Sequence, residues 1–236
     1  MPSLAKPHVA ARRASPRSQR PAVAVPARPA GRTHRRAEET IRAAAEVFAE
    51  RGYHGATTQD IADLLGIRQA SLYYYFRSKE AALEVVCLRG VEGYVDTAAA
   101  IAHGSGDVPR RIAAIIDAHL APLLDRHAFV RVFLKERQYL PPEGRRKVGR
   151  LSRRYERIIE SLIAEGVADG SLASTTDPRT ATLALLGMCN AVVDWVGLEP
   201  ALDVPTIATR FAAIVTDGLA VRAGRAGTRR GAIARS

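Results

Sequence analysis

The sequence predicts an all-α fold in two parts, a short N-terminal unit of three helices and a longer C-terminal helical region. Apolar side chains recur at helical spacing from Glu38 onward, and no stretch shows the alternation of a half-buried strand. Glycine and proline interrupt this pattern where helices are expected to end or begin. With 236 residues, 47% of them hydrophobic, the chain can form one or two domains with a substantial core.

The positive charge of the chain is concentrated at its two ends. The formal net charge is +11, yet residues 1–37 hold nine Lys or Arg and residues 222–236 hold five, with no acid in either stretch. The body between them has 21 basic and 24 acidic groups. Both ends lack apolar periodicity, so we expect disordered basic arms at 1–37 and 223–236. The N-terminal arm suits a DNA contact or a passive tail, and it also resembles a transit peptide.

The first predicted helix begins at Glu38. Its apolar face is formed, at positions i, i+3, i+4 and i+7, by Ile41, Ala44, Ala45 and Phe48. Gly52 is expected to end the helix, because glycine tolerates the left-handed conformation that closes many helices.

Two short helices follow, joined by a tight turn. Thr57 stands at an N-cap position with Asp60 three residues later, a variant of the capping box. Gly66 ends this second helix, and a third is predicted over residues 68–76. This pattern is typical of a helix-turn-helix, so we predict such a domain over residues 38–82.

The remaining helical region is predicted to span residues 83–222. Ser78 caps a long fourth helix whose inner side carries Leu83, Val86 and Cys87. After the breaker run at 104–107, further helices are expected near 112–134, 143–169, 177–196 and 205–222.

The start of the third helix carries candidates for base recognition. A recognition helix fits the major groove and reaches base edges with its N-terminal side chains. Arg is the common bidentate partner of guanine and Gln of adenine, so Arg68 and Gln69 are predicted to read bases, beside Ala70 and Ser71. The alternative is that Arg68 and Gln69 form only a solvated helix start.

Neighbouring residues suit phosphate contacts. Because an amphipathic helix cannot bury the three consecutive phenols Tyr73, Tyr74 and Tyr75, at least one is expected to face outward, where its hydroxyl can donate to a phosphate. Thr58 and Lys79 stand at helix starts, where a hydroxyl, a cation and free N–H groups attract phosphate.

The charge of the N-terminal unit alone is poor for binding DNA. Residues 38–95 hold six basic groups and nine acids. We therefore predict that Arg32, Arg35 and Arg36, directly before the first helix, contact the backbone or the minor groove.

Many positions between Ile41 and Leu83 share a recognisable spacing. They include Ala45-Glu46-Val47-Phe48, Gly52-Tyr53, Thr57-Thr58, Ile61-Ala62, Leu65-Gly66-Ile67, Ser71-Leu72-Tyr73-Tyr74-Tyr75-Phe76 and Ser78-Lys79-Glu80-Ala81. In these segments the chain resembles the DNA-binding domain of TetR-family transcriptional regulators.

The resemblance implies a homodimer on a palindromic operator and an all-α ligand domain, with helices near 177–196 and 205–222 forming the dimer interface. It places at DNA-contact positions Thr58, Arg68, Gln69, Ala70, Ser71, Tyr73, Tyr74 and Lys79. Two residues depart from the common pattern. Arg68 stands where many members have a small capping hydroxyl, which leaves the start of the recognition helix open, and Tyr75 stands where His is frequent.

Polar residues within the apolar C-terminal helices are candidates for an effector site. An apolar cavity needs a few such groups to orient a ligand, and we select His119, Phe133, Arg137, Tyr155, Asn190 and Trp195. A basic run from Arg145 to Arg154, together with residues 133–140 and 185–187, is similar to the branch of the family that senses acyl-CoA thioesters. The cations would suit the CoA phosphates, and an apolar tunnel would suit the acyl chain. The alternative is that these groups are surface or core residues.

Other functional classes find little support in the sequence. Cys87 and Cys189 stand alone in apolar runs, the six His lack metal-ligand spacing, and no hydrolase or nucleotide-binding motif occurs, so we expect no catalytic residue, metal or cofactor. No apolar run is long enough to cross a membrane, and we expect a cytoplasmic, nucleoid-associated protein. Together with the resemblance, the sequence predicts a ligand-responsive, sequence-specific DNA-binding regulator, a repressor that a small hydrophobic or acyl-CoA-like effector releases from a palindromic operator. The alternative is a non-specific DNA-compacting protein that uses its Arg-rich ends.

Overall fold

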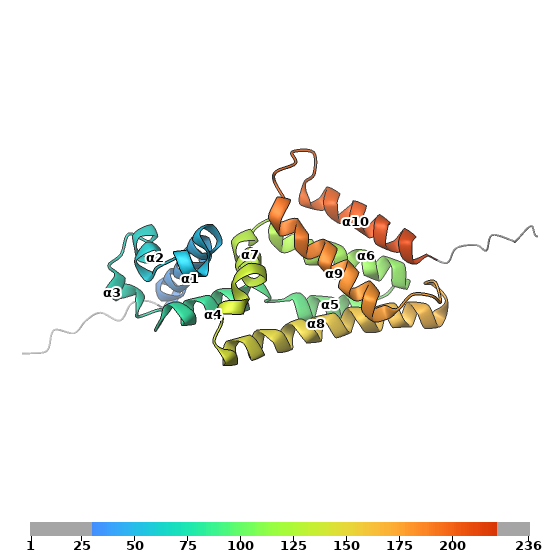
Figure 1. Ribbon diagram of the computed structural model, residues 1–236, viewed down its shortest axis with the longest axis horizontal. Coiled ribbons are helices and arrows are strands. Elements are labelled where there is room, and N and C mark those ends of the chain that lie inside the picture. The colour runs from blue at the N-terminus through green and yellow to red at the C-terminus, as the bar shows by residue number, and fades with distance from the viewer. Residues whose placement is uncertain (1–29, 221–236) are drawn as a thin grey trace, which may run out of the picture.

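The computed structural model describes residues 30–220, and the side chains from residue 34 onward. Within that range the secondary structure is helical, and Figure 1 shows the helices in two groups along the long axis. The helices are α1 (Ala30–Gly55), α2 (Thr58–Leu64), α3 (Gln69–Leu72), α4 (Lys79–Gly90), α5 (Tyr94–Ala102), α6 (Val108–Leu120), α7 (His127–Glu136), α8 (Pro142–Asp169), α9 (Pro178–Trp195) and α10 (Val204–Leu219), with single 3-10 turns η1 (Ala121–Leu123) and η2 (Arg137–Tyr139). The prediction of an all-α fold is confirmed.

Each group of helices has its own apolar core. The first core joins α1, α2, α3 and α4 through side chains such as Phe48, Ile61, Leu72 and Leu83, and α7 contributes Val132 to it. The second core lies between α5, α6, α8, α9 and α10. Helix α7 lies at the junction, because its Val132 packs in the first core and its Val130 packs in the second.

Among the described helices, five begin at side-chain caps that the residue types provide. In each case the cap oxygen accepts a hydrogen bond from the backbone N–H three residues later, which satisfies one of the free donors of the first turn. The caps are Thr57, Ser78, Asp107, Asp177 and Asp203. At Thr57 the bond is reciprocal, because Asp60 accepts from the Thr57 N–H at 2.8 Å, so the predicted capping box is present.

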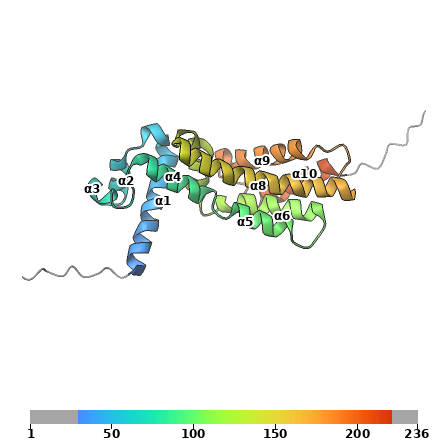
Figure 2. The same ribbon diagram turned by 90° about the horizontal axis from the view of Figure 1, so that it is seen from below.

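Several helix boundaries differ from the predicted ones. Helix α1 begins at Ala30 rather than Glu38, so part of the stretch expected to be disordered is helical; Arg35 and Arg36 pair with Glu39 one turn later, which favours the helix. Figure 2 shows these first turns projecting away from the other helices. The disorder predicted for the rest of the N-terminal arm and for 223–236 lies outside the described residues.

The third and fourth helices are shorter than predicted. Helix α3 ends at Leu72, because Phe76 and Leu72 both turn into the core and the chain between them closes into a tight turn. Helix α4 ends at Gly90, and Gly93 then adopts φ +84°, which starts α5 in a new direction.

Two glycines set the geometry at the junction. Gly52 has φ +67° and kinks α1 where the sequence predicted its end. Gly90 lies where α4 passes α7, and a Cβ there would stand 2.6 Å from the Phe129 carbonyl oxygen. Any larger residue at Gly90 would therefore push α4 and α7 apart. None of the described helices is both long and apolar enough to cross a membrane.

Candidate DNA-binding surface and effector cavity

The turn after α3 presents two phenol rings to solvent. Leu72 and Phe76 are buried and anchor this segment on α1, α2 and α4. Tyr73 is 50% exposed and Tyr74 78% exposed, whereas Tyr75 is half-buried against the core. At least one of the three consecutive phenols was expected to face outward, and two of them do, Tyr73 and Tyr74.

The residues predicted to read bases lie together at one end of the molecule. Arg68, Ala70 and Ser71 are exposed. Arg68 is the N-cap of α3 in extended conformation and makes no side-chain cap bond, which frees its guanidinium for other contacts. The Gln69 amide donates to the Thr58 hydroxyl at 2.7 Å, so these two candidates from α2 and α3 are held in one unit.

Lys79, at the start of α4, lies over the ring of Tyr53. Its ammonium stands 4.4 Å from the centre of the Tyr53 ring, within cation–π range. The Tyr53 hydroxyl donates to Glu80 at 2.7 Å. Burial and the neighbouring Glu80 carboxylate raise the pKa of Tyr53 to about 12, and the same hydrogen bond lowers the pKa of Glu80. These contacts fix the position of a cation at the N-terminus of α4.

Of the three arginines predicted to contact DNA before Glu38, the side chain of Arg32 lies outside the described residues, and Arg35 and Arg36 differ in their surroundings. Arg35 has a 77% exposed side chain and pairs with Glu39 over 3.6 Å. Arg36 pairs with the same carboxylate at 3.0 Å and also donates to the Leu65 carbonyl oxygen at 3.4 Å. Arg36 therefore ties α1 to the end of α2, and Arg35 is the more available of the two.

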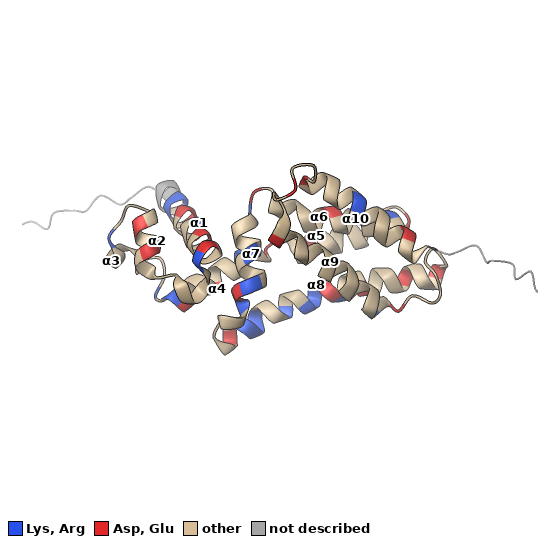
Figure 3. Cartoon of the chain, turned by 45° about the horizontal axis from the view of Figure 1, so that its top comes forward, with Lys and Arg blue, Asp and Glu red and all other residues tan. Residues whose placement is uncertain are grey.

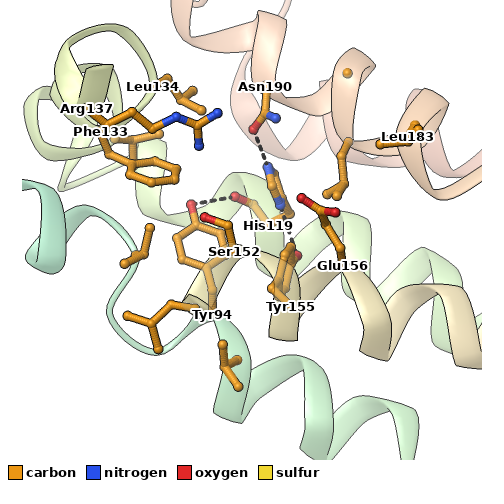
Figure 4. A pocket seen from close by; sticks show the side chains of 16 residues that line it. Tyr94, His119, Phe133, Leu134, Arg137, Ser152, Tyr155, Glu156, Leu183 and Asn190 are labelled. Carbon is orange, nitrogen blue, oxygen red and sulfur yellow. Dashed lines mark hydrogen bonds between the residues drawn. The ribbon is translucent and has the colours of Figure 1, made fainter. Parts of the chain in front are cut away.

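A cavity of about 300 Å³ opens into the C-terminal core between α5, α6, α7, α8 and α9, with Val91 after α4 and Arg137 of η2 at its border. Figure 4 shows its polar groups: Tyr94, His119, Arg137, Ser152, Tyr155, Glu156 and Asn190. The rest of the wall is apolar, with Phe133, Leu134, Leu151, Leu183 and Leu186 among its members. An apolar enclosure with few polar groups is typical of a small-molecule site.

His119 is the centre of a hydrogen-bond chain at the floor of this cavity. Its Nδ1 lies 2.9 Å from the Tyr155 hydroxyl, its Nε2 lies 3.2 Å from the Asn190 Oδ1, and its carbonyl oxygen accepts from Tyr94 at 3.1 Å. Burial lowers the pKa of His119 to about 4, so the ring is neutral near pH 7. A neutral ring that donates from Nε2 to Asn190 then accepts at Nδ1 from Tyr155. Burial also raises the pKa of Tyr155 and Tyr94, so the floor carries no charge.

The charges of the cavity lie on two of its other side chains. The Arg137 guanidinium stands 4.9 Å from the centre of the Phe133 ring. Glu156 pairs with Arg179 at 2.9 Å. Arg137 is thus the cation of the lining that a ligand can meet.

Five of the six residues predicted for the effector site line the cavity, and Trp195 does not. Trp195 is the last residue of α9, and its ring packs against Phe211 of α10 with centroids 6.4 Å apart. The prediction missed Tyr94, because only the break at Gly93 turns that residue toward His119.

A cationic face runs along the first half of α8, which also contributes Leu151, Ser152 and Tyr155 to the cavity. Its side chains are exposed and comprise Arg145, Arg146, Lys147, Arg150, Arg153 and Arg154. Figure 3 shows this run in blue beside α7. Lys147 pairs with Glu84 at 3.5 Å.

Two domain families match the chain over most of the described residues. Residues 41–86 match the domain described as "Bacterial regulatory proteins, tetR family", and residues 105–219 match "Tetracyclin repressor-like, C-terminal domain". A solved TetR/AcrR-family regulator from Thermobifida fusca is 32% identical and matches with a TM-score of 0.60 over 78% of this chain and 98% of its own.

The chain belongs to the TetR family of transcriptional regulators. As a TetR-family member it is a DNA-binding regulator of the ligand-responsive type.

Relatives of this TetR-family chain share nearly its whole folded length. The repressor KstR2 of Rhodococcus jostii is 28% identical over 80% of this chain and 93% of its own. The fatty acid metabolism regulator protein of Bacillus subtilis is 24% identical over 77% of this chain and 94% of its own. The structure of AibR with isovaleryl coenzyme A and operator DNA shares the fold, with a TM-score of 0.69 at 21% identity over 76% of this chain and 97% of its own.

A short segment of this TetR-family chain joins the cavity to the DNA-binding helices. Arg137 lines the cavity, and the preceding residue, Glu136, accepts a hydrogen bond from the Tyr53 backbone N–H at 2.8 Å. Tyr139 stacks on the Tyr53 ring, with centroids 5.5 Å apart and planes at 15°. Tyr53 in turn holds Lys79. The end of α7 and η2 therefore contact both sites.

Proposed function

We propose that this protein is a homodimeric repressor that binds a palindromic operator and is released from it by an acyl-CoA thioester. The observation that carries the effector class is the cavity, apolar and uncharged at its floor, with Arg137 on its wall and the cationic face of α8 beside it. The apolar acyl chain would fit the cavity, and the polyanionic CoA part would fit Arg137 and the cationic face of α8.

Each candidate on the DNA side has a proposed role. Arg68 and Gln69, with Ala70 and Ser71 beside them, face base edges in the major groove. Thr58, Tyr73, Tyr74 and Lys79 bind phosphates and set the register of the helix, and Arg35 and Arg36 add backbone contacts. The exposure of Arg68, Tyr73 and Tyr74 supports this division.

In the cavity, Asn190 is the proposed partner of the thioester carbonyl. It receives the His119 bond through its oxygen, which leaves its NH2 group as a donor. Arg137 and the exposed arginines of α8 bind the phosphates of the CoA part. The name of the Bacillus subtilis relative, a fatty acid metabolism regulator, supports an acyl effector for this chain too.

Release follows from a shift of α7 when the cavity fills. Arg137 moves toward the ligand, and Glu136 and Tyr139 move with it. The hydrogen bond and the ring stacking that position Tyr53 then change, and with them the position of Lys79 over the Tyr53 ring. In a dimer this alters the spacing of the two recognition helices, which must fit successive turns of the major groove.

The test is fluorescence anisotropy of a labelled operator, taken from sequence selection, with palmitoyl-CoA added at increasing concentration. We expect palmitoyl-CoA to release the operator, and free CoA or free palmitate to release it far less. The double variant Arg150→Glu with Arg153→Glu should weaken the response about ten-fold or more, since it removes charge-assisted contacts. Arg110→Glu, an exposed charge reversal on α6, is the matched control. Equal responses of both variants, or none in the native chain, would contradict the proposal.

A further inference from the structure

A second cavity lies directly behind the floor of the effector cavity. It has a volume of about 260 Å³ and lies between α5, α6, η1 and α8. Two of the side chains that line it, Tyr94 and Tyr155, also line the effector cavity. Their rings meet edge to face with centroids 5.5 Å apart, so together they form the wall between the two spaces.

We propose that the Tyr94–Tyr155 pair sets the longest acyl chain that the effector cavity accepts. This proposal rests on the proposed function, since it needs an acyl chain in the cavity. The effector cavity, at about 300 Å³, lies at the lower end of the range for ligand sites, so the position of its floor limits ligand length.

The second cavity suits an acyl chain that passes this wall. Its far side is formed mainly by apolar groups: Ala98, Ile101, Ile115, Ala118 and Pro122. Its charged members are Glu92, in the turn between α4 and α5, and Arg126, the N-cap of α7. The Arg126 guanidinium donates to the Glu92 carbonyl oxygen at 3.3 Å. Opening the wall would join this space of about 260 Å³ to the effector cavity of about 300 Å³.

A third hollow also adjoins the effector cavity, and more of the side chains that line it are charged than in the second cavity. It shares Val91, Val95 and Leu151 with the effector cavity, and its other members include the charged Arg89, Asp96 and Arg154. An acyl chain that entered this hollow would displace water from these charged side chains, which costs free energy. The tyrosine wall is therefore the boundary that matters for length.

Tyr94 is the side chain of the wall that can be shortened with least disturbance. Its hydroxyl bonds to a backbone carbonyl oxygen, whereas Tyr155 holds the ring of His119. Tyr94→Ala removes the ring and joins the cavities, and Tyr94→Phe keeps the ring and removes only the hydroxyl. Tyr94→Leu, which is shorter than the ring but still apolar, serves if the alanine variant does not fold.

The experiment is a calorimetric titration of the full chain with saturated acyl-CoA thioesters from butyryl to stearoyl. For the native chain, affinity should rise about four-fold with each added methylene that becomes buried and then stop rising at a fixed length. Tyr94→Ala and Tyr94→Leu should move that limit to longer chains, and Tyr94→Phe should leave it in place.

A filling substitution in the second cavity provides the matched control. Ala118 lines the second cavity and not the effector cavity. Ala118→Leu should leave the native limit unchanged, and combined with Tyr94→Ala it should bring the limit back toward the native length. Leu151→Ala, which thins the wall to the charged hollow, should not extend the limit.

The outcomes separate this proposal from the proposed function. Binding of acyl-CoA with the same limit in the native chain, Tyr94→Ala and Tyr94→Leu would overturn the role of the tyrosine wall and leave the effector class standing. Absence of binding at every chain length in the native protein would overturn both. A longer limit in Tyr94→Ala that Ala118→Leu reverses would support both.

Discussion

Lys79 shows how one side chain can be prepared for a contact before its partner arrives. Its ammonium lies over the Tyr53 ring, and Tyr53 is held by hydrogen bonds to Glu80 and Glu136. A fixed cation loses less rotamer entropy on binding a phosphate than a free one. The proposed phosphate contact therefore depends on residues that do not touch DNA.

The residues proposed to contact DNA are expected to separate into two classes on substitution. Lys79→Ala and Tyr73→Phe should weaken binding to every duplex by a similar factor, because they remove phosphate contacts. Arg68→Ala and Gln69→Ala should cost about 1–3 kcal/mol on the operator and also relax base preference. Anisotropy titrations on operator and random duplexes measure both. Equal losses on the two duplexes for all four variants would refute the assignment of Arg68 and Gln69 to bases.

The stability of the C-terminal core is expected to depend on the charge of His119. Its pKa is lowered from 6.5 to about 4 in the folded protein. As the pH falls from 6.5 to about 4, the unfolded chain therefore binds a proton at His119 that the folded protein does not bind. The stabilisation is therefore complete near neutral pH and is lost on acidification, by about 3 kcal/mol.

Urea unfolding of the native chain and of His119→Gln measures this loss. Between about pH 7 and about pH 4, the native chain should lose more stability than the variant, which has no proton to gain at this position. Carboxylates such as Asp60, whose pKa is lowered, contribute to both proteins and cancel in the comparison. Parallel pH profiles would show that His119 is not the group responsible.

The sequence predicted local features of single residues well and long-range meetings poorly. The Thr57 cap and the Gly52 break depend on a few neighbouring residues, and both are found in the structure. His119, Tyr155 and Asn190 were selected one by one, because nothing local indicates that residues 36 and 71 positions apart will share a hydrogen-bond chain. Trp195 was selected on residue type alone and lies outside the cavity.

At the scale of elements, η2 and the end of α7 connect the effector cavity with the helices of the candidate DNA-binding surface. They touch the effector cavity through Arg137 and the kink of α1 through Glu136 and Tyr139. This connection could not be predicted from local sequence patterns, since Tyr53 and Glu136 are 83 residues apart. Helix α3 also escaped prediction in its length, because the end at Leu72 follows from packing of Phe76 rather than from a glycine or proline.

Breaking this connection should uncouple the two sites without emptying either. Glu136→Ala removes the bond to the Tyr53 N–H, so acyl-CoA binding should change little while its effect on operator affinity falls. The change measured is the ratio of operator affinities with and without ligand, which is the coupling free energy. Gln138→Ala, an exposed neighbour on η2, is the control. Full ligand response in Glu136→Ala would exclude this route.

At the scale of the whole molecule, each of the last two helices carries an exposed large apolar side chain. Ile214 of α10 is 61% exposed, and Leu183 of α9, which also borders the effector cavity, is 50% exposed. Large side chains of this kind on neighbouring helices suit the helix-on-helix interface that the proposed homodimer requires. Figure 1 shows α9 and α10 at the end of the molecule away from α3, so such an interface leaves the recognition segment free.

A charge on this surface should separate the protomers. Ile214→Arg is expected to give a monomer in size-exclusion chromatography with light scattering, and to bind the full operator no more tightly than a half-site. Leu124, which is 66% exposed and lies outside α9 and α10, provides the control Leu124→Arg. A dimer that survives Ile214→Arg would place the interface elsewhere.

The central claim, that the turn after α2 and the start of α3 read a specific operator in a dimer, is tested most directly by selecting bound sequences from a random duplex pool. The full chain and a chain lacking residues 1–31 are compared at about physiological salt. We predict one inverted-repeat motif in both selections, with half-sites spaced for two recognition helices. Enrichment of no motif, with binding that disappears when residues 1–31 are removed, would contradict the account and leave a non-specific polycation.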